Sequence, residues 1–158
     1  MASSSLPAVL TVARALMRGL PGLNPDPQPS DQDQHPVVCL VYSGNGRTQL
    51  STSRGDTTPV VWQFETIVIA VYTAQSDLGE DLQVLEPYTY LVPRALFAKF
   101  AKDRWNDTVV NIGDSTSPGS TWPIRRALTG PVSIGGVNCI GYEFECDVTF
   151  QEDVLYDS

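Results

Sequence analysis

Three acidic side chains recur at every second position near the carboxyl end of the chain, at Glu143, Glu145 and Asp147. Carboxylates that act as an acid and base pair in glycoside hydrolysis usually face one another across a cleft, from different elements. Alternate residues of one strand instead project side by side, about 6.5–7 Å apart. The spacing therefore favours either a solvated strand face or a negatively charged wall over paired catalytic acids.

The other residues that could do chemistry show no recognisable spacing of nucleophile and base. His35 is the only histidine and stands beside Pro36, whereas the base of a catalytic triad is held by packed neighbours. Residues 44–46 (GNG) lack the full spacing of a phosphate-binding loop, and the tripeptide RGD at 54–56 arises often by chance. We predict a surface histidine, a flexible turn, no enzyme activity and no cofactor.

The three cysteines, Cys39, Cys139 and Cys146, form an odd set without paired spacing. Cys39 lies in the apolar run 37–41, and Cys146 falls among the apolar positions of an alternating segment. We expect buried free thiols in a reducing compartment rather than a disulfide framework. A zinc site would need further ligands that a single histidine does not supply, so no metal site is predicted.

Length and charge set the broad class of the protein. The chain has 158 residues, 42% of them apolar and 18% charged, which predicts one globular domain with a real core. The net charge of −8 argues against a DNA-binding surface, because phosphate contacts need clustered Lys and Arg. No apolar run reaches the ~20 residues of a membrane span, and Arg14 and Arg18 interrupt the first twenty residues. We expect a cytosolic protein where it is made, without a secretory signal.

Two segments predict long strands. Residues 138–151 alternate strictly between apolar and polar side chains, which predicts a strand with one packed face and one solvated face. The segment 60–72 is apolar on both faces in its second half, so we expect a central strand that is covered on both sides there. A strand at 123–132 turns at Gly135 and Gly136 into the last strand, which predicts a C-terminal hairpin.

The remaining elements are predicted from caps and breakers. A helix begins at Leu6 after the cap Ser5 and ends near Gly19. Residues 82–105 have a helical pattern that Pro87 and Pro93 interrupt, which predicts a kink near residues 90–92 or two short helices. We expect short strands at 37–42 and 106–112. The rest is predicted to be irregular: a proline-rich connection at 24–36, a long loop at 43–59, a loop at 114–121 and a frayed acidic tail at 152–158.

These elements predict one α+β domain over residues 1–158. Its mainly antiparallel sheet of about four strands carries helices on one face and ends in the C-terminal β-hairpin. The order of the elements, together with several short motifs, resembles the tail terminator (tail completion) proteins of long-tailed bacteriophages and related gene-transfer particles. The resemblance extends from about Leu6 to Phe150 and includes residues 20–23 (LPGL), 36–38 (PVV), 64–71, 85–88 (LEPY), 135–137 (GGV) and 141–144 (GYEF).

The resemblance implies a structural virion protein, assembled in the host cytoplasm, that forms a homohexameric ring. Such a ring caps the tail tube protein and joins it to the head-completion or neck protein, and the family has no catalytic residues. DNA would pass through the bore without specific binding, repelled by Glu143, Glu145 and Asp147. Contacts with neighbours would involve the loop residues and the two arginines before the hairpin, which could also pair with the acids: Arg47, Arg54, Asp56, Asp114, Arg125 and Arg126.

Three alternatives remain open from the sequence. A head-completion stopper and a tail-tube subunit are joining proteins of the same class, and the sequence separates them poorly from a terminator. A small-molecule-binding α+β domain, or an unrecognised enzyme, would require a deep pocket with convergent polar groups. The sequence offers no constellation of residues for such a pocket.

Overall fold

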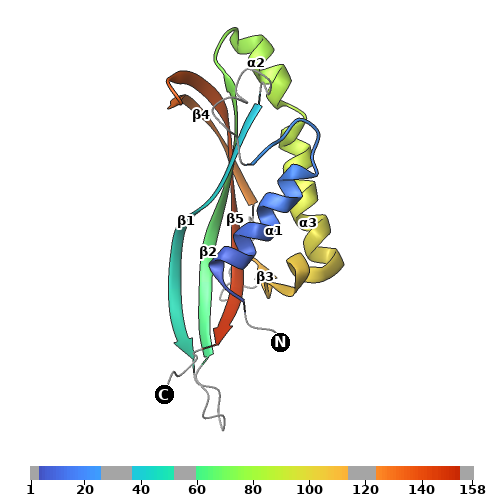
Figure 1. Cartoon of the computed structure of the whole chain (residues 1–158), viewed down its shortest axis with the longest axis vertical. Coiled ribbons are helices and arrows are strands. Elements are labelled where there is room, and N and C mark those ends of the chain that lie inside the picture. The colour runs from blue at the N-terminus through green and yellow to red at the C-terminus, as the bar shows by residue number, and fades with distance from the viewer. Residues whose placement is uncertain (1–3, 26–36, 52–59, 114–123, 154–158) are drawn as a thin grey trace.

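The computed structural model describes residues 4–25, 37–51, 60–113 and 124–153. These residues form two layers, with helices packed against one face of a twisted antiparallel sheet (Figure 1). The sheet has five strands, one more than the sequence predicts, and the α+β class is confirmed. The other face of the sheet carries no helix of the described chain, and it is called the open face below.

The two longest strands form the centre of the sheet. β2 (Val60–Ala74) pairs with β1 (Val37–Ser51) on one side and with β5 (Val137–Asp153) on the other. Beyond β5 lie β4 (Ile124–Ile134) and the two-residue β3 (Asn111–Ile112), and every pairing is antiparallel. The central position of β2 and the C-terminal β4–β5 hairpin are confirmed, with Gly135 and Gly136 at positive φ in the turn.

The main core lies between the sheet and the helices. The predicted packed face of β5 is confirmed, because its alternating apolar residues contact Ile67, Ile69 and Val71 of β2. Cys39 joins this core, while Cys139 packs with Ala70 and Tyr72 in a second cluster; β2 is thus covered on both sides in its second half. All three cysteines are free and buried, as predicted. The buried β5 residues of the main core are Phe144, Cys146, Val148 and Phe150, and the half-buried Tyr142 packs against this core.

The first helix, α1 (Leu6–Arg18), follows the predicted capping pattern. The backbone N–H of Ala8 donates to the Ser5 hydroxyl at 3.4 Å, which satisfies one of the free amide groups of the first turn. Gly19 is the C-cap. Val9, Ala13 and Met17 lie on one side of the helix and are fully buried against the sheet.

The second helical segment is divided into two helices, one of the two alternatives that the sequence left open, although only the first of them is short. α2 (Leu78–Leu85) begins four residues earlier than expected, because the side chain of Asp77 accepts hydrogen bonds from two backbone amides of its first turn. α3 (Tyr88–Asp107) begins directly after Pro87. The prediction of a kink near residues 90–92 is wrong, since the break falls at Glu86 and Pro87, where the missing proline amide interrupts the ladder. Pro93 lies inside α3.

The last turn of α3 is left-handed. Residues 104–107 all have positive φ between 51° and 62°, although none is a glycine. Such a conformation costs roughly 1–2 kcal/mol per residue. The side chain of Trp105 is completely buried there, and its indole Nε1 donates to the Leu96 carbonyl oxygen at 2.9 Å. Burial of this ring and its hydrogen bond oppose the backbone strain and hold the turn in place.

The predicted loop at 43–59 is wrong in its first part, because residues 43–51 continue β1. The register of the β1–β2 pair shifts between Ser43 and Gly46, where the glycines form a bulge within the strand. Glu152 and Asp153 belong to β5 and not to a frayed tail, and of the strand predicted at 106–112 only β3 is present. The remaining predictions for 26–36, 52–59, 114–123 and 154–158 lie outside the described residues.

Candidate functional site

The acidic row lies on the open face of the sheet. Residues two apart along a strand share a face, so Glu143, Glu145 and Asp147 project from β5 on the side opposite to the core. Directly beside them on β2 lie Ala70, Val68 and Thr66, in that order. The predicted solvated face is confirmed only in part, because the three acidic residues are half-buried and Thr149 on the same face is completely buried. The row also has partners that the sequence did not assign.

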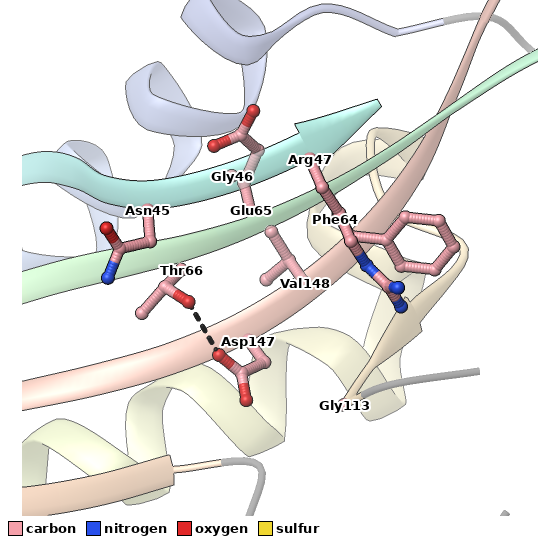
Figure 2. Close-up of a pocket in the computed structure, with 9 residues that line it drawn as sticks. All are labelled: Asn45, Gly46, Arg47, Phe64, Glu65, Thr66, Gly113, Asp147 and Val148. Atoms are coloured by element: carbon pink, nitrogen blue, oxygen red, sulfur yellow. Dashed lines mark hydrogen bonds between the residues drawn. The ribbon is translucent and has the colours of Figure 1, made fainter. Parts of the chain in front are cut away.

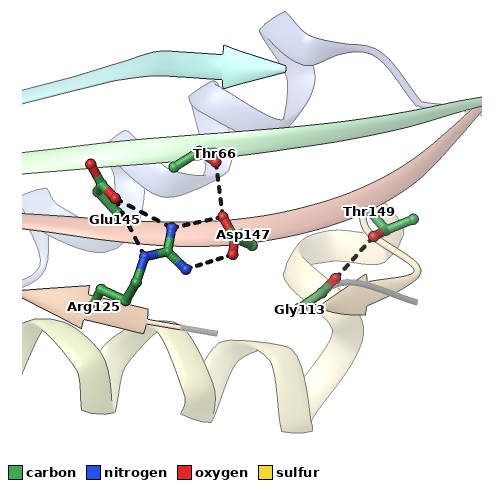
Figure 3. A network of polar contacts seen from close by, with 6 residues as sticks. All are labelled: Thr66, Gly113, Arg125, Glu145, Asp147 and Thr149. Atoms are coloured by element: carbon green, nitrogen blue, oxygen red, sulfur yellow. Dashed lines mark hydrogen bonds and ion pairs between the residues drawn. The ribbon is translucent and has the colours of Figure 1, made fainter. Parts of the chain in front are cut away.

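Arg125 of β4 lies between two acids of the row (Figure 3). Its Nη1 and Nη2 donate to the two carboxylate oxygens of Asp147 at 2.7 and 3.1 Å, and its Nε and Nη2 contact Glu145 at 3.4 and 3.3 Å. The hydrogen bonds with Asp147 raise the pKa of Arg125 above its usual value; Glu145 adds to this effect and burial opposes it. The guanidinium is thus a permanent charge that bridges the two carboxylates.

Asp147 is the most constrained acid of the three. Besides Arg125, it accepts a hydrogen bond from the Thr66 hydroxyl at 2.8 Å, which ties β5 to β2 as well as to β4 (Figure 3). Two residues further along β5, Thr149 is fully buried and donates to the Gly113 carbonyl oxygen at 3.1 Å. This end of the acidic row is therefore a cross-strand network that holds β2, β4 and β5 together.

Glu143, at the other end of the row, lies beside two tyrosines. The Tyr72 hydroxyl donates a hydrogen bond to its carboxylate. Burial first, and then this hydrogen bond, raise the pKa of Tyr72 above the usual value of 10.0. The pKa of Tyr42 on β1 is raised by burial and by the charges of Glu143 and Glu145. The open face is consequently negative around these phenols, and they stay protonated at neutral pH.

A hollow of about 270 Å³ opens at the Asp147 end of the row (Figure 2). The guanidinium of Arg47 lies 4.4 Å from the centroid of the Phe64 ring on one side of it. Thr66 and Asp147 contribute polar oxygens, but these already bond to each other and to Arg125. Among the residues that the structure describes, no group of three His, Cys, Asp or Glu side chains could hold a metal ion. The hollow therefore combines an arginine–aromatic contact with polar oxygens that are already hydrogen-bonded.

The predicted interface residues are dispersed over the molecule. Arg47 lies on strand β1 and not in a loop, which corrects the sequence prediction. Arg125 pairs with the acids, one of the two alternatives that the sequence left open. Arg126 projects to the helix-covered face, where its guanidinium lies 5.2 Å from the centroid of the Tyr142 ring. The other three predicted residues lie outside the described part of the chain: Arg54, Asp56 and Asp114.

The sequence did not single out Thr66, Tyr72 or Tyr42 as partners of the acidic row. Thr66 and Tyr72 are 81 and 71 positions away in the sequence from the acids that they contact. Tyr42 comes from β1, which is connected to β5 through β2. Only the register of the sheet brings these residues together. The available signal was weak: Thr66 and Tyr72 fall on one face of the alternating segment 60–72.

Comparison with known proteins adds no family to this description. No model of a known protein family matches the chain, and no curated protein matches its sequence. The helices within the described ranges include none that is long and apolar enough to cross a membrane.

Proposed function

We propose that this chain is the subunit of a ring in the tail of a virus particle, where it caps the tail tube and joins it to the head or neck. The observation that carries the proposal is the open sheet face. It is stiffened by charged contacts across β2, β4 and β5, and it remains negative. A rigid surface of this kind suits a task done by shape and repulsion. The ring assembly is inferred from the resemblance of the sequence to tail terminator proteins.

The edges of the sheet support assembly into a ring. In the described chain β1 pairs with β2 as its one strand neighbour, so no described strand covers its outer edge, and β4 and β3 form the opposite edge. An unpaired edge is a ready surface for another chain. A ring needs two different surfaces on each subunit that meet head to tail and close. Two unlike edges on opposite sides of one sheet fit that requirement.

The charge of the open face supports the passage of DNA. Three carboxylates against one guanidinium leave the acidic row negative, and the whole chain carries −8. Six such subunits around a bore would repel the phosphate backbone, so that DNA slides through without binding. In this proposal Glu143 and Glu145 face the conduit, while Asp147 mainly holds Arg125 and Thr66.

Negative-stain imaging and mass photometry of the purified protein, with and without the tail tube protein of the same particle, test the proposal. We expect single rings, or a monomer that assembles into a ring at the tip of the tube. Long stacked tubes of this chain alone would instead identify a tail-tube subunit. A monomer that persists at every concentration, with tube protein present, would contradict the ring.

A further inference from the structure

The left-handed turn at the end of α3 is held against a cost in backbone free energy. Residues 104–107 all have positive φ, a conformation that L-amino acids adopt with strain. Asparagine and aspartate tolerate it better than other side chains, so most of the cost falls on Arg104 and Trp105. Opposing this cost are the complete burial of the Trp105 side chain and the hydrogen bond from its indole to the Leu96 carbonyl oxygen. The two opposing terms are similar in size.

A right-handed continuation of α3 would not bury this tryptophan. Successive residues of an α-helix are about 100° apart, so Trp105, nine positions after the fully buried Leu96, would project from the opposite side of the helix. The turn therefore has two mutually exclusive conformations: strained and left-handed with the indole in the core, or relaxed and right-handed with the indole in solvent. A small difference between two opposing terms permits local opening without global unfolding.

The chain that follows the turn covers part of one edge of β5, and residues 109–113 are called the strap. The Val110 amide donates to the Thr149 carbonyl oxygen at 2.7 Å, and the Gly113 amide donates to the Asp147 carbonyl oxygen at 2.8 Å. The Thr149 hydroxyl returns a bond to the Gly113 carbonyl oxygen (Figure 3). The described part of β4 does not pair with these two residues of β5, so the strap is what covers the edge beside the acidic row.

The strap is connected directly to the left-handed turn. The amides of Thr108 and Val109 both donate to the Arg104 carbonyl oxygen, at 3.2 and 3.3 Å. In a right-handed α-helix this carbonyl would accept from Thr108, four positions later, so the bond from Val109 belongs to the left-handed turn. Val109 is itself buried and is the first residue of the strap. A change of hand in the turn therefore removes an anchor of the strap.

We infer that Trp105 controls a conformational switch that covers and uncovers this edge of β5. While the indole is buried, the turn is left-handed and the strap is bound. When the indole leaves the core, the turn relaxes to the right-handed form and the strap separates from Asp147 and Thr149. The uncovered edge then presents unpaired backbone groups, with which another strand can pair. The switch is a property of the isolated chain, so it stands or falls independently of the proposed ring.

Hydrogen exchange of the isolated protein, followed by NMR at single residues, tests the switch. We expect the amides of Val110 and Gly113 to exchange at least about tenfold faster, relative to their intrinsic rates, than amides in the centre of β2. The indole N–H of Trp105 should exchange with the same opening equilibrium as these two amides. Strap amides that are protected as strongly as β2, or that open while the indole N–H stays protected, would overturn the inference.

Substitutions in the turn show whether it controls the strap. Arg104→Gly relieves the strain and disfavours a right-handed helix, so it should slow the exchange of the strap amides about tenfold. The matched control Arg104→Ala removes the same side chain but keeps the strain, and should stay within about twofold of the unchanged protein. Trp105→Phe keeps an aromatic ring without the indole donor and should speed the exchange several-fold. Equal slowing by Arg104→Ala, or strap rates that neither Arg104→Gly nor Trp105→Phe alters, would contradict the switch.

Discussion

Arg125 of β4 and Asp147 of β5 form a bidentate ion pair, in which two guanidinium nitrogens donate to the two oxygens of one carboxylate at 2.7 and 3.1 Å. The pair links the two strands of the β4–β5 hairpin, and the hydrogen bond from Thr66 to Asp147 extends this connection to β2. Bidentate geometry restrains both side chains more strongly than a single hydrogen bond does. The acidic row is thus partly a structural brace and partly a charged surface.

The energetic coupling of this pair is measurable. We predict that a double-mutant cycle with Arg125→Ala and Asp147→Ala gives a coupling of about 0.2–1 kcal/mol in the free energy of unfolding. The value is modest because the side chains are 43% and 31% exposed, so water and salt screen the attraction. Urea denaturation of the four proteins measures it. Strictly additive effects would mean that the pair does not hold the hairpin.

The raised pKa of Tyr72 predicts that the stability of the protein decreases at alkaline pH. Its pKa in the folded protein is raised above 10.0, so the folded state favours the protonated phenol. The stabilisation is complete below pH 10, the unfolded value, and is lost as the pH rises from there through the folded value. We expect the unfolding free energy to fall above about pH 10.

The change Tyr72→Phe should remove part of this alkaline decline, in urea titrations carried out from about pH 8 upward. Tyr90→Phe changes an exposed tyrosine in the same way and is the matched control. An unchanged decline in Tyr72→Phe would show that other groups cause it.

At the left-handed end of α3, a substitution by glycine should be tolerated, which is unusual for a helix. Arg104 is exposed and has φ of 51°, a conformation that glycine adopts without strain. We expect Arg104→Gly to leave the stability unchanged or to raise it by up to about 1 kcal/mol. The control Ala98→Gly, at an exposed position of the regular helix, should lower it by about 1 kcal/mol. Thermal unfolding compares the two, and an equal loss in both would contradict the left-handed turn.

Charge reversal of the acidic row tests the conduit. We predict that Glu143→Lys with Glu145→Lys leaves ring assembly intact, since Asp147 still holds Arg125, and slows or blocks DNA ejection by attracting phosphate. Glu80→Lys with Glu86→Lys makes the same charge change on and beside α2 and should not affect ejection. Ejection assays on particles with each variant provide the measurement. Normal ejection with a lysine-lined row would show that these residues are ordinary surface charge.

Local signals predicted the elements in which packing and hydrogen bonding agree with the sequence pattern. Strict alternation located β5, and the Ser5 cap located α1, because each pattern reports a structure formed within a few residues. The extension of β1 through residues 43–51 was missed, since its glycines and polar side chains are typical of a loop. Only pairing with β2 makes that edge segment a strand.

For the same reason, only part of the candidate site could be predicted from the sequence. The acids could be placed on one face from their spacing alone. Their partners depend on the register between strands, which sets Thr66 beside Asp147 and Arg125 beside Glu145. Register is decided by the packing of the whole sheet. The start of α2 four residues before the predicted position likewise depends on the Asp77 cap, which was not identified from the sequence.

The most direct measurement is electron cryomicroscopy of the neck of the intact particle that carries this chain. The account predicts a closed ring of six copies at the end of the tail tube, with the open sheet face, and Glu143 and Glu145 in particular, turned towards the DNA conduit. A chain found away from the conduit, or turned so that its helices line the bore, would contradict it.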